Sequence, residues 1–558
     1  MTAARGAFRS RGLRAGLAAA LLLSTSSVAL HAQDRDLQKE LDQLKAQINS
    51  LKAAINEQKV ETRHTKEKLK VVAERPYSPP LVAAVPEGAT PLFVTADKKM
   101  HFGAITITPG GFVAMEGRFS TRNEQADIGT QYSAIPFGPQ GNTNELVFSA
   151  RQSRIAALVE APISSNMSVA GYGEFDFLGS GATSNRNESD SYVPRIRHLY
   201  ATLDNNEYGM HVLAGQTWSL LTMNSKGITP RNEVTPPTID AQYVPGFVWK
   251  RHPQIRLTKD FNEKLWFSVS AEEAQTTFGT ACAAGVNAQA VTSNTGATET
   301  ATCALGGQAN LNGTAVTNFS INHVPDVVGK VAYEARLGDH DVHLEGSAIY
   351  RDLYDRVAYA NGTAANLDTT GYGFGGGMIA AIIPKRLDFQ VSGLIGKGIG
   401  SYGTAQFGDT TFGSNGSLSG LREEMLLAGL TFHATPSIDL YAFSGVEQVQ
   451  PNYYATNAAG TAFAGYGAPN ANNSGCYNDV TAGTCAGNAK RIWQVTAGMW
   501  DKIYKGNFGE VRVGVQYAYT QRELFSGNAT TAPLPALAGS PRTVDHSILT
   551  SLRYYPFQ

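Results

Sequence analysis

The chain has 558 residues, and only 17% of them are Asp, Glu, Lys or Arg. Its formal charge of −1 excludes a strongly basic nucleic-acid-binding protein, and it lacks the repeated apolar runs of about 20 residues that a bundle of transmembrane helices needs. With 23 tyrosines and 24 phenylalanines, it is too rich in aromatic residues to be wholly disordered. A β-rich protein or a large soluble globule remains.

Residues 1–32 are predicted to be a secretory signal peptide. Four arginines flank the start of a short apolar stretch from Leu17 to Leu23, and Ala32 is a small residue at the expected cleavage point. The apolar run is too short to span a bilayer, so we expect the segment to be removed. The mature protein is therefore expected outside the cytoplasm.

A heptad pattern follows over residues 33–74. Leucine or isoleucine recurs at spacings that alternate between four and three residues, at Leu37, Leu41, Leu44, Ile48, Leu51 and Ile55. This seam predicts a coiled coil that oligomerises the chain, and isoleucine at a with leucine at d favours two strands. An amphipathic helix packed on its own domain is the alternative, but it would need a wider apolar stripe. The proline-rich residues 75–101 cannot continue the helix and are expected to form a linker.

From residue 102 to residue 558 the hydrophobic pattern alternates with a period of two. About sixteen segments do so, many of them ten residues or longer, which is the length of a tilted membrane-spanning strand. Their connections alternate between short turns and long loops, as in outer-membrane barrels. The sequence therefore predicts an all-β transmembrane barrel of about 16 antiparallel strands with an N-terminal α-helical coiled coil. The coiled coil is expected in the periplasm, and the long loops outside the cell.

The four cysteines of the chain lie in two of the long loops. An oxidising exterior allows two disulfides within these loops, Cys282–Cys303 and Cys476–Cys485. A metal site is the alternative, but the spacing is not CxxC and no histidines cluster nearby. We therefore predict no metal and no cofactor.

Polar side chains of such a barrel face its lumen. The apolar positions are even-numbered around Leu146 and odd-numbered around Ile155. One extra residue explains this change, which predicts a β-bulge near Gln152 that turns both Arg151 and Arg154 inward. The residues predicted to line the lumen are the basic Arg151, Arg154, Arg195, Arg197, Lys250, Arg256, Lys330 and Arg512 and the acidic Asp388 and Asp439. The basic and acidic sets lie on roughly opposite walls, which predicts a transverse field with an arginine side that binds carboxylates. Ordinary lumen polarity without substrate preference is the alternative.

The loop over residues 218–246 is expected to fold inward and narrow the lumen, because its prolines stiffen it. Its candidate constriction residues are Lys226, Arg231, Glu233, Asp240 and Tyr243. A plain surface loop is the alternative.

Four short motifs resemble the DcaP-like trimeric outer-membrane porins. They are Arg151-Gln152-Ser153-Arg154, Arg195-Ile196-Arg197-His198-Leu199-Tyr200, Gly215-Gln216-Thr217-Trp218-Ser219 and Pro253-Gln254-Ile255-Arg256. The resemblance implies a homotrimer, an inward-folded constriction loop and passive uptake of small anions, especially dicarboxylates. It also implies that the arginines of the first, second and fourth motifs line the pore. The chain departs from the usual barrel pattern by ending in Gln558 after an aromatic residue.

These features predict an outer-membrane porin of a Gram-negative bacterium, a passive diffusion channel for small hydrophilic, anionic solutes. A phosphate- or sugar-selective porin is one alternative, and an outer-membrane anchor with the coiled coil as a cell-wall tether is another. The sequence contains no GxSxG, HExxH or GxxxxGK[ST] motif, and we predict no enzymatic activity. The expected partners are outer-membrane lipid, further copies of the chain in a homotrimer and small anionic solutes, with no nucleic acid.

Overall fold

The computed structural model describes Lys45 and most of the chain from residue 92 onward. The described ranges are 92–95, 98–124, 126–179, 192–280, 289–292, 298–304, 320, 322–359, 364–414, 416–456, 458–479, 485–527 and 540–558. The signal peptide 1–32, the coiled coil 33–74 apart from Lys45, and most of the linker 75–101 lie outside them. Cys282 also lies outside, so the Cys282–Cys303 disulfide stays a prediction. The chain divides into two units, Met1–Ala89 and Thr90–Gln558, and the second is described below.

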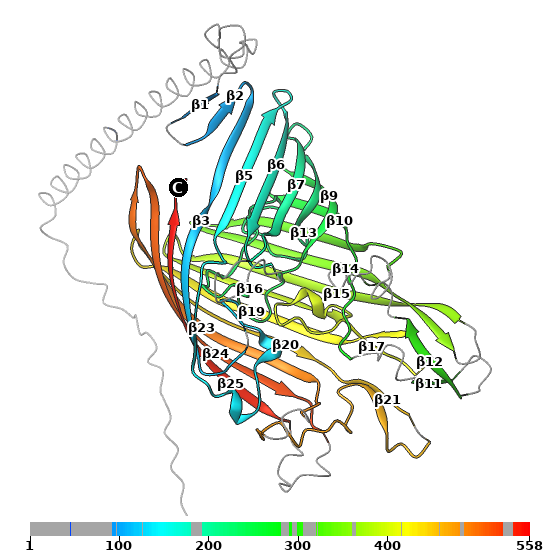
Figure 1. The fold of residues 1–558 in the computed structure, drawn as a ribbon. Coiled ribbons are helices and arrows are strands. Elements are labelled where there is room, and N and C mark those ends of the chain that lie inside the picture. Colours follow the sequence, from blue (N-terminus) through cyan, green and yellow to red (C-terminus); the bar gives the residue numbers. More distant parts are fainter. Residues whose placement is uncertain are drawn as a thin grey trace, which may run out of the picture. The chain divides into compact units, whose positions relative to one another are not determined.

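Sixteen antiparallel strands form a closed barrel (Figure 1). In order around the ring they are β3 (Ile105–Ser120), β5 (Arg154–Pro162), β6 (Met167–Asp176), β7 (Arg195–Asn205), β8 (Met210–Trp218), β9 (Arg251–Phe261), β10 (Leu265–Glu272), β13 (Asp326–Leu337), β14 (His340–Tyr359), β15 (Ala364–Ile383), β16 (Leu387–Lys397), β19 (Arg422–His433), β20 (Ile438–Val449), β23 (Ala489–Gly506), β24 (Gly509–Leu524) and β25 (Arg542–Tyr555). The last strand pairs with the first, with Ile548 opposite Phe119. Closure satisfies the backbone groups of both edges, which an apolar surrounding could not. The predicted barrel is confirmed.

Shorter elements extend the ring or lie in its connections. They are β1 (Leu92–Val94), β2 (Met100–Phe102), β4 (Glu145–Ser149), β11 (Gln289–Thr292), β12 (Thr298–Ala304), β17 (Thr410–Phe412), β18 (Leu418–Gly420), β21 (Asn452–Ala455), β22 (Phe463–Tyr466) and the 3-10 turns η1 (Tyr132–Ala134), η2 (Pro139–Gly141) and η3 (Gly400–Tyr402). The β1–β2 hairpin pairs onto β3, so strand structure begins within the stretch predicted to be linker.

Apolar side chains cover the outer wall of the barrel. Val113, Ile155 and Ile255 are 63%, 63% and 65% exposed, whereas the alternate residues Glu116 and Arg118 are 1% exposed on the inner side. This inversion of the usual soluble pattern is the one expected for a wall that faces lipid. The described residues contain no helix long and apolar enough to cross a membrane.

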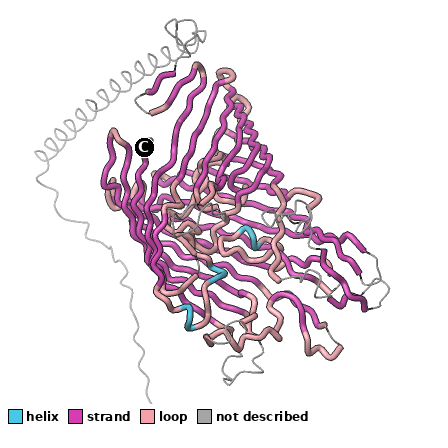
Figure 2. The backbone as a smooth tube through the Cα atoms, viewed as in Figure 1, coloured by secondary structure: helices cyan, strands magenta, loops and turns pink. Residues whose placement is uncertain are grey.

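Loop length differs between the two rims of the barrel. We call one rim the short-turn end, where the connections are 163–166, 206–209, 262–264, 338–339, 384–386, 434–437 and 507–508. The other is the long-loop end, toward which β14 and β15, each 20 residues long in total, extend (Figure 2). One long loop contains the disulfide Cys476–Cys485, with a Cα–Cα distance of 4.5 Å, in agreement with the expected pairing.

The bulge near Gln152 is present. Ser149 on β4 lies opposite Glu116 of β3, and Arg154 on β5 lies opposite Phe112. Four residues, 150–153, therefore face three on β3, which is a one-residue insertion. The insertion restores the alternation that turns Arg154 inward.

The hydrophobic core lies inside the barrel rather than between layers. One buried cluster joins the connection between β8 and β9 to the walls, through Ile239, Val244 and Phe247 packed with Tyr441 and Leu549. A second cluster packs three long loops against β20 and β23. Loops therefore occupy much of the interior, and the vestibule described below lies at the short-turn end.

Candidate functional site: an inward loop above an arginine-bordered vestibule

The connection between β8 and β9, residues 219–250, crosses the interior of the barrel; we call it the inward loop. The Ile239 amide donates to Oε1 of Gln516 on β24 at 2.6 Å, and the Ile239 carbonyl accepts from Gln152 at 2.6 Å. Further along, the Gly246 amide donates to Oε1 of Glu447 on β20 at 2.7 Å. The predicted inward fold of this loop therefore has a structural basis in bonds to several walls.

Local chemistry fixes the turns of the inward loop. Asp240 is 1% exposed and accepts from Thr130 Oγ1 at 2.6 Å and from the Gln242 amide at 2.8 Å, which makes an Asx turn. Burial raises the pKa of the Asp240 carboxyl, although these donors oppose the rise. Arg231 and Tyr243 have left-handed φ angles of 70° and 65°, so the backbone reverses sharply at both positions.

A cavity of about 790 Å³ lies at the short-turn side of the inward loop. Two further cavities, of about 830 and 810 Å³, adjoin it, because the third shares Asp388 with the first and Lys226 with the second. We call the three together the vestibule. Strands from most of the ring border it, and the inward loop contributes Lys226, Arg231, Asp240 and Tyr243 to its lining.

Arginines border one side of the vestibule. Arg154 on β5, Arg512 on β24 and Arg553 on β25 come from neighbouring parts of the ring. Arg553 Nη2 binds Oε1 of Glu116 at 2.6 Å, and its guanidinium lies 4.7 Å from the ring centroid of Trp500. Arg231 adds a fourth guanidinium from the inward loop, and its Nη1 donates to the Tyr200 hydroxyl at 3.2 Å.

Arg197 joins this wall to the inward loop. Its Nε binds Oε1 of Glu174 at 2.5 Å, its Nη1 binds Oδ2 of Asp176 at 3.1 Å, and its Nη2 lies 3.4 Å from the Tyr243 hydroxyl. Arg195 also binds Asp176, through two nitrogens, and keeps 32% of its side chain exposed. Since two carboxylates hold these guanidiniums in place, the arginine wall is fixed in position without being fully neutralised.

Acidic side chains border the vestibule on β16 and β20. Asp388 and Asp439 both bind the imidazole of His433 on β19, at 3.2 and 2.6 Å. These strands lie roughly across the ring from β5, which carries Arg154. For Arg154, this agrees with the predicted placement of basic and acidic side chains on opposite walls. Arg512, however, is only two strands from Asp439, so the predicted separation of charge is partial.

The remaining predicted lumen residues point inward but do not border the vestibule. Arg151 binds Asp127 at 2.9 Å, Arg256 donates to the Trp218 carbonyl at 2.8 Å, and Lys330 donates to the Thr222 carbonyl at 2.7 Å. Lys250 belongs to the end of the inward loop rather than to β9, and donates to Ser401 at 2.7 Å. Glu233 closes the tip of the loop through a bridge with Asn224. These side chains hold loops, because loops fill the interior beside them.

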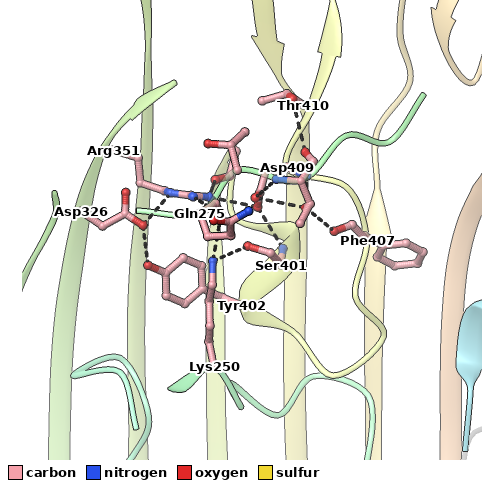
Figure 3. A network of polar contacts seen from close by, with 12 residues as sticks. Lys250, Gln275, Asp326, Arg351, Ser401, Tyr402, Phe407, Asp409 and Thr410 are labelled. Carbon is pink, nitrogen blue, oxygen red and sulfur yellow. Dashed lines mark hydrogen bonds and ion pairs between the residues drawn. The ribbon is translucent and has the colours of Figure 1, made fainter. Parts of the chain in front are cut away.

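Three features were not predicted from the sequence. Arg553 alternates with the outward Leu552 and Tyr554, so the period of two could have placed it in the lumen. His433 follows the outward Leu430 and Phe432, so the same period could have placed it in the lumen, but not between two carboxylates. A buried network around Arg351 on β14 also went unpredicted: Arg351 binds Asp326 and Asp409, each at 3.0 Å, and fixes the loop between β16 and β19 (Figure 3).

Tyr243 is expected to ionise unusually easily. Burial opposes ionisation, but the guanidiniums of Arg197, Arg154 and Arg251 together outweigh it and lower the pKa of Tyr243 to about 8, with Arg197 the strongest of the three. An alkaline absorbance titration should therefore show one phenolate forming near pH 8, which Tyr243→Phe removes and Arg197→Met moves to higher pH. Because the folded pKa is depressed, this stabilisation is complete above about pH 10 and is lost as the pH falls through about 8. A step near pH 8 that persists in Tyr243→Phe would contradict the assignment.

The sequence matches no protein-family model and no curated protein. Among solved structures, the fold is similar to the outer membrane channel DcaP of Acinetobacter baumannii, at 17% identity and a TM-score of 0.53 over 81% of this chain and 97% of that one. An anion-selective porin from Comamonas acidovorans aligns at 10% identity and a TM-score of 0.42, covering 81% of this chain and 99% of that one. OmpF of Salmonella typhi aligns at 9% identity and a TM-score of 0.40, covering 82% and 99%. The chain thus has the barrel fold of the DcaP channel.

Proposed function

We propose that the protein is a bacterial outer-membrane porin, a passive diffusion channel for small hydrophilic, anionic solutes such as dicarboxylates. The observation that carries the proposal is the arginine-bordered vestibule beneath the inward loop. A narrowed, low-dielectric passage strengthens the interaction of these guanidiniums with a carboxylate, and fork geometry suits bidentate binding. The short turns would face the periplasm, where the coiled coil over residues 33–74 would lie, and the long loops would face outward.

Three neighbouring strands support a path for anions along the side of the inward loop. Arg154, Arg195 and Arg197 come from β5 and β7, with Glu174 and Asp176 of β6 between them. Arg154 and Arg195 keep 25% and 32% of their side chains exposed, so they are accessible to a solute. The carboxylates of β6 would weaken binding enough for release, which a conducting site requires.

A homotrimer with lipid around its outer wall is part of the proposal. The apolar outer face provides the lipid contact, and the fold likeness to the DcaP channel is consistent with a porin. A phosphate- or sugar-selective porin would differ in the solute that blocks the current. An anchor that uses the coiled coil as a tether would not need an inward loop or an arginine wall.

Arg154→Ala is expected to reduce anion preference. The change removes one guanidinium from the vestibule and one of the two arginines that bind Glu174, so the chloride-to-potassium permeability ratio should fall at least about threefold. The measurement is the reversal potential of single channels in a planar bilayer under a KCl gradient, followed by addition of succinate as a blocker.

Arg356→Ala is the matched control, because Arg356 is an exposed arginine on the long-loop extension of β14, outside the vestibule. It should leave the reversal potential unchanged. Absence of any conductance in the wild-type protein would end the porin proposal, and a reversal potential that Arg154→Ala does not move would end the assignment of that wall.

A further inference from the structure

Three histidines at the short-turn end share one arrangement. Each imidazole lies between two carboxylates, with one carboxylate at each ring nitrogen. His211 on β8 binds Asp204 at 2.8 Å and Asp260 at 3.2 Å. His343 on β14 binds Glu334 at 2.7 Å and Glu345 at 3.0 Å. His433 on β19 binds Asp439 at 2.6 Å and Asp388 at 3.2 Å.

These three acid–histidine–acid bridges line the vestibule from positions spread around the ring. His211 and Asp260 border one of its three cavities, His343 and Glu334 another, and His433 with its two partners the third. The bridges run from β7 to β20, whereas Arg154, Arg512 and Arg553 occupy β5, β24 and β25. The part of the ring between these arginine strands therefore carries three protonatable bridges.

Bonding at both ring nitrogens requires the charged form of each imidazole. A neutral imidazole has one donor nitrogen and one acceptor nitrogen, and the acceptor would face the lone pairs of a carboxylate. The imidazolium donates at both nitrogens and meets two acceptors. Loss of the proton would thus break one contact in each bridge and add one negative charge to the vestibule wall.

The other side chains near the bridges do not cancel the change in charge that follows loss of the imidazole proton. Trp266 stacks on His211 with its ring centroid 5.8 Å away, and Lys226 and Lys259 border the same cavity as His211. Lys330 binds Glu345 at 2.8 Å, and Lys264, Arg336 and Asp341 border the same cavity as His343. Lys502 binds Asp439 at 2.9 Å. These lysines and arginines keep their charge across the range in which histidine titrates, so the bridges dominate the change.

Metal binding is a poorer account of the three bridges. The two carboxylates of each bridge lie at opposite ring nitrogens, so they do not converge on one point. The described residues hold no group of three or more His, Cys, Asp or Glu side chains arranged to bind a metal ion.

We propose that the three acid–histidine–acid bridges set the ion selectivity of the channel by protonation, favouring anions when the imidazoles are charged and cations when they are neutral. The inference rests on the proposed porin function. His211, His343 and His433 are its specificity-determining residues. The His343 bridge also reaches the inward loop, because Glu334 and Glu345 accept from the amides of Gly227 and Asn224.

Reversal potentials in a KCl gradient, measured at intervals from about pH 6 to about pH 10, test the inference, because the two flanking carboxylates stabilise each imidazolium and deprotonation needs an alkaline pH. In the wild type, the chloride-to-potassium permeability ratio should fall at least about threefold between the ends of this range. The triple variant H211Q/H343Q/H433Q should show the low ratio throughout, because glutamine keeps hydrogen-bonding groups but carries no charge. Each single variant should remove part of the response, which covers failure of the triple variant to fold.

Two controls separate the bridges from other titrating groups. His546→Gln changes an exposed histidine on β25 outside the vestibule and should keep the full response. Tyr243→Phe removes the phenol that ionises near pH 8 and should keep most of it. A wild-type ratio that does not change with pH, or single and triple variants that retain the wild-type response, would overturn the inference while leaving the porin function standing. Absence of conductance in the wild type would instead overturn the porin function, and the inference with it.

Discussion

Replacing residues 220–249 with a two-residue Asn-Gly turn is expected to raise the single-channel conductance at least about threefold, because a 16-strand barrel without an internal loop encloses a wide aqueous channel. The flanking strands should stay paired. Ser219 already donates its amide to the Lys250 carbonyl at 2.8 Å, so the ends to be joined are adjacent. Anion preference should fall together with the rise, because Arg231 and Tyr243 leave and the solute no longer passes close to Arg197.

A smaller deletion tests whether the crossing segment or the tip of the loop is the constriction. The tip is closed by the Asn224–Glu233 bridge and by the Ser225 amide, which donates to the Asn232 carbonyl at 2.7 Å. Replacing residues 226–231 with Gly-Gly should leave the crossing segment in place and raise the conductance less than the full deletion. Equal conductance in the full deletion and the wild type would contradict a constriction by this loop.

The strands and their faces could be predicted from the sequence because each depends on local alternation. Arg154 turns inward because one inserted residue restores the period of two, and that insertion is visible in the sequence. Arg256 and Lys330 turn inward by the same alternation, without an insertion in their strands. The alternation does not show what fills the interior of the barrel. It therefore could not show that these two side chains hold the inward loop instead of facing solvent.

The contact between Asp409 and Arg351 could not be predicted from the sequence, for a different reason. Asp409 lies in a loop without periodicity, and its partner Arg351 is 58 positions earlier in the sequence, on β14. Only the closed fold brings them together. Arg197, by contrast, was predicted as a lumen residue, but its contact with Tyr243 requires the inward loop to be in place. The candidate site was thus predictable as a set of inward charges and not as a geometry.

Arg351→Met is expected to lower the free energy of unfolding by about 3 to 5 kcal/mol, because it leaves two buried carboxylates without their shared cation. Arg351 is fully buried between Asp326 and Asp409, and Tyr402 adds a hydroxyl bond to Asp326 at 2.8 Å (Figure 3). Urea unfolding of the protein in detergent micelles or lipid vesicles measures the loss. Arg356→Met, on the same strand but exposed, is the control and should cost much less.

The pH dependence of that loss distinguishes charge from packing. Burial opposes ionisation of Asp409, but Arg351, Lys250 and the amides of Ser401 and Thr277 together outweigh it and hold the pKa of Asp409 below its usual range, with Arg351 the strongest of these groups. This contribution is present above the unfolded pKa of about 4 and is lost as the pH falls through the folded pKa. The difference between wild type and Arg351→Met should therefore shrink in acid. The triple variant R351M/D326N/D409N should recover part of the stability at neutral pH, since it removes the buried charges together. A deficit that stays constant with pH, and that the triple variant does not relieve, would mean that Arg351 acts through its packing volume alone.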